Sequence, residues 1–89
     1  MAEPRATTVE TPRQFWDVER LIGKVQKNER GDIIRVSHTE KDNRKYVDVR
    51  VFYMGADRGM RPGKGIALPS ELADEVAGYI LQASESIRN

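Results

Sequence analysis

The sequence predicts an α+β domain in which a curved, four-stranded antiparallel sheet is followed by one C-terminal helix, and this domain is expected to be dimeric. Period-two runs of β-branched and aromatic residues, separated by turn residues, predict the strands. Apolar residues recurring every three or four positions near the C-terminus predict the helix. The 89 residues include no cysteine, so a second copy of the chain is the expected source of extra stability for so small a domain.

The clearest strand is expected over residues 45–53, where Val47, Val49 and Val51 occupy one face. Tyr46, Asp48, Arg50 and Phe52 alternate with them on the other face. Further strands are expected over residues 21–27, 32–39 and, as a short piece, 66–68. The spacing of apolar residues over 15–25 also suits a helical turn that runs into the first strand. Residues 54–65 contain four glycines and Pro62, so a loop is expected there.

The C-terminal helix is expected to begin near Ser70, a suitable N-cap that is followed by acidic residues. One helix covers only one face of a sheet, which leaves the other face open for binding. The apolar stripe of the helix is wide enough to pack on its own sheet and on a second copy. The residues expected to mediate dimerisation are Leu72, Val76, Tyr79, Ile80 and Ala83.

The expected organisation is a disordered tail over residues 1–14 and a single binding and dimerisation domain over residues 15–89. No apolar run approaches the ~20 residues that span a bilayer, and the polar N-terminus does not resemble a secretory signal. The expected location is therefore the cytoplasm, in association with the nucleoid in a prokaryote, or the nucleus in a eukaryote.

Positive charge is concentrated in the middle of the chain. Residues 20–64 hold 12 Lys or Arg against six Asp or Glu, whereas the segments on either side are mildly acidic. Such a basic module is typical of a polyanion-binding surface, and equally of a solvated one. A strand face with Tyr46, Arg50 and Phe52 offers cations for phosphates and rings for bases. Alternatively, these rings pack under the helix or in a dimer interface, and Arg50 pairs with Asp48 or another neighbour.

The sequence contains no constellation that indicates catalysis, so no enzyme activity and no cofactor are expected. The segment Gly59–Gly65 has three residues before its Gly-Lys pair and no following Ser or Thr, so it is not a nucleotide-binding P-loop. His38 is the single histidine, and without any cysteine there is no expected metal site. A basic, glycine-rich loop can still present backbone N–H groups to phosphates.

Three blocks resemble the transcriptional coactivator family positive cofactor four, also called p15. They are Ile34–Ser37, Tyr46–Met54 and Met60–Leu68. The resemblance implies a curved four-stranded sheet with a helix, dimerisation through helices and sheet, and binding of single-stranded or unwound DNA with little sequence preference. The short tail resembles that of compact prokaryotic members.

The resemblance also implies roles for individual residues. Arg50 matches a strand arginine that contacts the DNA backbone, and Tyr53 falls where the family has a base-stacking tryptophan. Strand alternation puts Tyr53 with the valines unless the strand bulges, and Phe52 is otherwise the substitute, with help from Tyr46. The expected phosphate contacts are Arg35, Lys41, Arg44, Lys45, Arg50, Arg61 and Lys64. A loop one residue shorter than the family's, and a hairpin over 38–45 without an aromatic, predict weaker binding than is usual in the family.

The sequence thus predicts a homodimeric protein that binds single-stranded DNA, as a coactivator-like or replication and repair accessory protein. Two alternatives stay open. The open face could instead bind transcription or repair proteins, and the groove could take RNA, because no residue is an evident reader of the 2′-hydroxyl.

Overall fold

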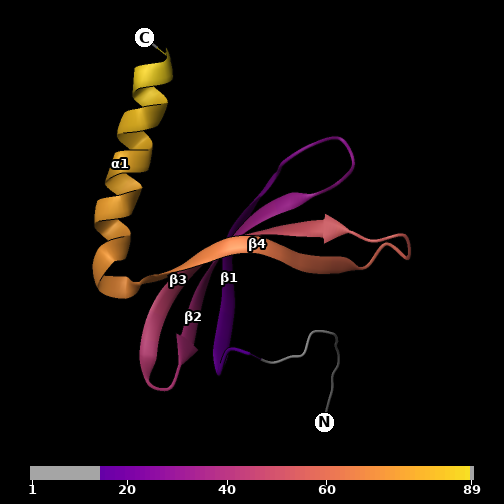
Figure 1. Ribbon diagram of the computed structural model, residues 1–89, viewed down its shortest axis with the longest axis horizontal. Helices are drawn as coiled ribbons and strands as arrows, with labels where there is room; N and C mark the ends of the chain where they lie inside the picture. The colour runs from indigo at the N-terminus through magenta and orange to yellow at the C-terminus, as the bar shows by residue number, and fades with distance from the viewer. Residues whose placement is uncertain (1–14, 89) are drawn as a thin grey trace.

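The computed structural model describes residues 15–88 and contains one four-stranded antiparallel sheet with the strand order β1-β2-β3-β4, followed by one helix (Figure 1). The expected β-β-β-β-α order is confirmed. The predicted tail over 1–14 lies outside the described residues. The elements are β1 (Val18–Gln26), β2 (Ile33–Lys41), β3 (Arg44–Met54), β4 (Met60–Pro69) and α1 (Ser70–Arg88).

Polar connections join the first three strands, as a loop over residues 27–32 and a tight turn at Asp42 and Asn43. Asp42 and Asn43 connect β2 to β3 with φ angles of 52° and 66°, the left-handed conformation of a type I′ hairpin turn. Between β1 and β2, Asp32 is buried and accepts hydrogen bonds from the side chain of Asn28 (3.0 Å) and from the backbone N–H of Met54 (3.1 Å). The first bond closes the loop on itself, and the second fastens it to the end of β3.

The expectation that residues 54–65 form a loop is wrong for residues 60–65, which belong to β4. The strand is possible because β4 lies at the edge of the sheet, where Pro62 needs no second strand partner. Gly65 is required by close approach, since a Cβ there would collide with the carbonyl oxygen of Val49 and lie 2.7 Å from the Cα of Arg50. Pairing with β3 therefore outweighs the low strand propensity of this segment. At the other end of the sheet, β1 begins at Val18, three residues earlier than expected.

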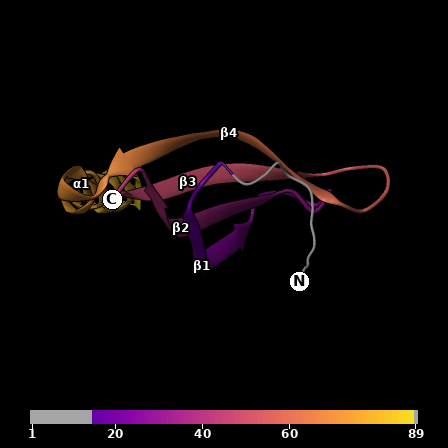
Figure 2. The same cartoon turned by 90° about the horizontal axis from the view of Figure 1, so that it is seen from below.

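Two bulges curve the sheet. In β1 the register with β2 shifts between Leu21 and Gly23, which leaves Ile22 as an extra residue. In β4, Gly63 and Lys64 together lie opposite Val51 of β3. Bulges bend the strand that carries them and increase its twist. The sheet is accordingly bent and twisted when it is viewed along its edge (Figure 2).

The two faces of the sheet differ in chemistry. The face that we call the polar face carries Arg35, Ser37 and Thr39 of β2 and Tyr46, Asp48, Arg50 and Phe52 of β3. The apolar face carries Ile34 and Val36 of β2, Val47, Val49 and Val51 of β3, and Ile66 and Leu68 of β4. Ser37, Thr39 and Asp48 are buried, whereas no hydrophobic side chain within residues 15–88 is.

Helix α1 does not cover either face, contrary to expectation. It extends away from the sheet beyond the end of β4 (Figure 1), and none of its residues is buried. Its apolar stripe and the apolar face of the sheet are therefore both uncovered in the single chain. Within the described residues, no helix is long and apolar enough to cross a membrane.

Candidate nucleic-acid interface

A row of three cations crosses the polar face. Lys24 of β1 pairs with Arg35 of β2, and Arg35 pairs with Arg50 of β3. Because neighbouring strands lie about 4.8 Å apart, the three Cα atoms span about 10 Å. Like charges directly opposite each other on a sheet destabilise it. This basic row is therefore suited to an anion that bridges several of its members.

Lys24 was missed by the sequence analysis, and the bulge at Ile22 explains why. Without the bulge, the register set by Leu21 and Ser37 would place Lys24 opposite Ile34, on the apolar face. The extra residue moves Lys24 to the polar face, opposite Arg35. The sequence signal was the adjacent apolar pair Leu21-Ile22 before Gly23, which breaks strict alternation.

Arg50 is held firmly in place. Its guanidinium donates two hydrogen bonds to the buried carboxylate of Asp48, at 2.8 and 3.0 Å, and a third to the carbonyl oxygen of Gly63 at 3.0 Å. The hydrogen bonds to Asp48 are the main cause of a raised Arg50 pKa, so this side chain stays charged. The arrangement agrees with the alternative that Arg50 pairs with Asp48. It also ties β3 to the bulge in β4.

Arg35, the other arginine of the basic row, has fewer polar partners than Arg50. Its guanidinium lies over the ring of Phe52, 4.2 Å from the centroid, in a cation–π contact. Its Nε is buried without a hydrogen-bond partner, and no ion pair joins Arg35 to another residue within 15–88. Stacked on Phe52, the guanidinium offers both charge and a flat surface, and unpaired bases stack on such planes.

Phe52, rather than Tyr53, shares the polar face with Arg50. The pairing of β2 with β3 is regular as far as Ile33 and Phe52, because the bulge lies in β4 and not in β3. Tyr53 pairs with Arg61 on the opposite face, and its ring fills the space where a Cβ on Gly63 would lie. Arg61 is further engaged with Asp57 through a 3.1 Å ion pair, in which both side chains are exposed.

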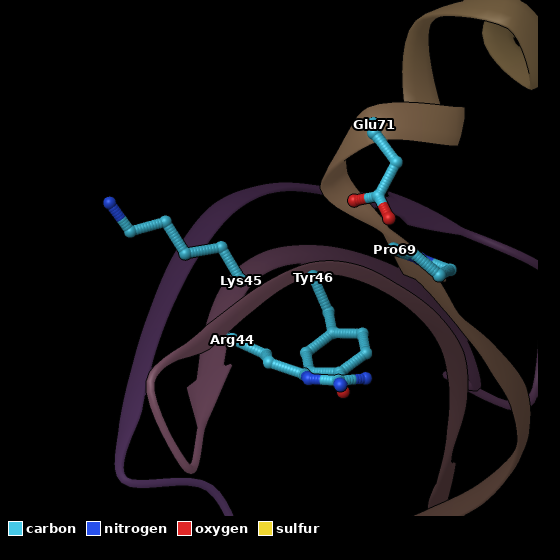
Figure 3. A pocket seen from close by; sticks show the side chains of 5 residues that line it. All are labelled: Arg44, Lys45, Tyr46, Pro69 and Glu71. Carbon is cyan, nitrogen blue, oxygen red and sulfur yellow. The ribbon is translucent and has the colours of Figure 1, made fainter.

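The β2–β3 hairpin carries three more of the expected cations. Lys41 pairs with Arg44, which continues the polar face, whereas Lys45 pairs with Glu40 on the other side. Figure 3 shows Lys45 extending away from Arg44 and Tyr46, at an open pocket that Pro69 and Glu71 complete. This pocket combines two cations with one carboxylate, so it is not a selective anion site.

The nine residues expected to contact DNA therefore do not all lie on one face of the sheet. The polar face brings together Arg35, Lys41, Arg44, Arg50 and Phe52, and the basic row adds Lys24. The other expected residues are Lys45, Tyr53 and Arg61, which lie on the opposite face, and Lys64, which is exposed in the β4 bulge.

Comparison with known proteins agrees with this architecture. Residues 28–77, more than half of the chain, match the family described as Transcriptional Coactivator p15 (PC4). A similar solved structure is the crystal structure of a PC4 homologue from Burkholderia pseudomallei K96243. The TM-score is 0.67 and the sequence identity 36%, over 78% of this chain and 93% of the homologue. A comparison with curated proteins gave no match. On the strength of the family match and the structural similarity, the chain belongs to the PC4 family of transcriptional coactivators.

Proposed function

We propose that the chain binds single-stranded DNA, with little sequence specificity, through the polar face of its sheet. The observation that carries this proposal is the basic row of Lys24, Arg35 and Arg50 beside the Arg35–Phe52 stack. Proteins hold single strands by combining cations along the phosphates with flat groups against the bases. Family membership supports nucleic-acid binding of the coactivator type in general.

The functional unit in this proposal is a homodimer. Isolated chains would expose Leu72, Tyr79 and Ile80 of the helix, which are 47%, 61% and 60% exposed. The apolar face of the sheet is uncovered as well. Exposed apolar surfaces of this kind are typical of protein interfaces. With that face used for dimerisation, the two polar faces remain open to nucleic acid.

The cellular role that we propose is that of a coactivator-like or replication and repair accessory protein, in the cytoplasm with the nucleoid or in a nucleus. No enzymatic step is part of this proposal. RNA binding and the capture of a transcription or repair protein are the competing outcomes.

The test is fluorescence anisotropy of a labelled ~20-nucleotide DNA, single-stranded and duplexed, at several salt concentrations. We expect single-strand binding to be much tighter than duplex binding. We also expect log K to fall with log salt by about 0.7 per phosphate contacted. Arg35→Ala and Phe52→Leu should weaken binding, whereas Arg88→Ala, at the exposed end of α1, should not. Absence of binding at low salt, or equal affinity for duplex, would refute the proposal. Tighter binding of an RNA of the same sequence would favour the RNA alternative.

A further inference from the structure

An aromatic cluster lies at the hairpin end of the polar face, and two of its members, Phe15 and Trp16, have no part in the site described above. Trp16 packs against Tyr46 of β3, with ring centroids 5.4 Å apart. Phe15 packs edge-on against Trp16 at 4.9 Å, and the ammonium of Lys41 lies 4.9 Å from the Phe15 centroid. The three rings therefore form a chain of contacts in space, with Trp16 between Tyr46 and Phe15.

Backbone and turn hydrogen bonds fix the segment that carries these rings. The N–H of Asp17 donates to the carbonyl oxygen of Glu40 at 2.8 Å, and the carboxylate of Asp17 accepts from the N–H of Asp42 at 2.9 Å. Both bonds join the chain just before β1 to the end of the β2–β3 hairpin. Phe15 is thereby held beside Lys41, although the two residues are far apart in the sequence.

Phe15 stays open to a ligand in this position. Phe15 is 65% exposed despite both contacts, whereas Trp16 is partly covered. A single exposed aromatic residue is common on protein surfaces. Phe15 differs from such a residue because its ring packs against a second ring and a cation, on the same face as the basic row. Exposed rings beside cations are what proteins use to stack the bases of single strands. Residues 15 and 16 also lie outside the span that matches the PC4 family.

We propose that Phe15, seated on Trp16 and Lys41, is a second base-stacking position for the single strand bound on the polar face. This inference rests on the proposed function. Tyr46 and Phe52 are six residues apart on β3, or about 20 Å along the strand, so one oligonucleotide can reach both ends of the face.

The charges near Phe15 belong to neighbouring residues, so the contribution of the ring to binding can be separated from theirs by its salt dependence. Lys41 lies against Phe15, and Arg44 is the partner of Lys41 across the hairpin. The carboxylate of Asp17 accepts a hydrogen bond from the N–H of Asp42 in the turn. Phe15 itself is uncharged. Its contribution should therefore come from contact with bases and should leave the salt dependence of binding unchanged.

The experiment uses the full chain and two labelled 20-nucleotide strands, one of thymidines and one with the same backbone but without bases. Phe15→Leu keeps an apolar side chain but removes the ring, and Phe15→Tyr keeps the ring as a matched control. Because stacking contributes roughly 1–3 kcal/mol per base, Phe15→Leu should weaken thymidine binding by about fivefold or more. Affinity for the abasic strand, and the slope of log K against log salt, should match those of wild type.

Trp16 provides a second measurement that needs no substitution, because it is the single tryptophan of the chain. Its emission should be quenched as the thymidine strand binds, with the same midpoint as the anisotropy signal. Thymidine binding that is unaffected by Phe15→Leu and leaves Trp16 emission unchanged would overturn the Phe15 proposal while leaving the proposed function standing. An equal loss of affinity for the abasic strand would also overturn it. A wild-type chain that binds neither strand refutes both proposals.

Discussion

Two aspartate–arginine pairs, one within β3 and one between the β3–β4 turn and β4, differ in their access to water. The side chains of Asp48 and Arg50 are 5% and 26% exposed, whereas those of Asp57 and Arg61 are 66% and 65% exposed. Loss of one partner leaves a charge with little water around it in the first pair, but only a solvated charge in the second. The first pair therefore organises the polar face, and the second has little influence on it.

We accordingly expect Asp48→Ala to lower the free energy of unfolding by about 2–4 kcal/mol, somewhat below the usual cost of breaking a fully buried pair because Arg50 keeps some contact with water. Asp57→Ala, the matched control, should lower it by no more than about 1 kcal/mol. Urea denaturation at one fixed protein concentration measures both. Equal effects of the two substitutions would show that Asp48 does not act through a sheltered ion pair.

Asp32 makes stability depend on pH in the acid range. Its pKa is lowered from the ordinary value of 3.8, first by the hydrogen bond from Asn28, and then by the N–H of Met54 and by Arg30. The folded state thus favours the carboxylate. Its contribution to stability is complete above the unfolded-state pKa, and it is lost as the pH falls through the depressed folded-state value.

Replacement of Asp32 by Asn should therefore lower stability at pH 7, and the difference from wild type should shrink below about pH 4 as the wild-type carboxylate becomes protonated. Urea midpoints measured from pH 7 to pH 2 test this behaviour. A wild-type advantage that stays constant over this range would mean that the charge of Asp32 is not what stabilises the loop.

At the scale of elements, the sequence predicted what depends on local pattern. The valine alternation in β3 located that strand and its two faces, and the three- and four-residue spacing after Ser70 located the helix. It did not predict β4 before Ile66, because glycine and proline have low strand propensity and only pairing with β3 stabilises them there. Nor did it place Phe15 beside Lys41, because that contact depends on hydrogen bonds from the segment before β1 to the hairpin. The resemblance predicted weaker binding than is usual in the family, partly because the hairpin over 38–45 has no aromatic residue, and in our proposal Phe15 supplies a ring beside that hairpin.

Two glycines of β4 and α1 should respond in opposite directions to the same substitution. Gly65→Ala would force a methyl group into the backbone of Val49 and Arg50, so we expect a loss of about 1–3 kcal/mol. A Cβ on Gly78 of the helix would meet nothing within 4 Å, so Gly78→Ala should stabilise by about 0.5–1 kcal/mol. Thermal unfolding of the two variants distinguishes the signs. Stabilisation by Gly65→Ala would show that β3 and β4 are not closely paired there.

At the scale of the whole molecule, the few residues that are buried within 15–88 are all polar, whereas an ordinary globular domain buries mainly apolar side chains. Asp32, Ser37, Thr39 and Asp48 are the buried residues within 15–88, while Ile66 is 57% exposed. Burial of apolar surface is the main source of folding free energy. The single chain therefore lacks a sufficient core, and an apolar face covered by a second copy would supply it. On this view dimerisation and nucleic-acid binding use opposite faces of one sheet.

Two exposed side chains of α1 test the dimer directly. Tyr79 and Leu81 are 61% and 64% exposed, so glutamate at either position should cost an isolated chain little. They lie about 200° apart around the helix, and only Tyr79 belongs to the apolar stripe. Tyr79→Glu should weaken dimerisation at least about tenfold, since it would bury a charge at the interface, whereas Leu81→Glu should leave the dimer intact. Light scattering on a size-exclusion column at several concentrations measures the mass. A monomeric wild type would show that the apolar surface has some other partner, and equal behaviour of the two variants would remove the stripe from the interface.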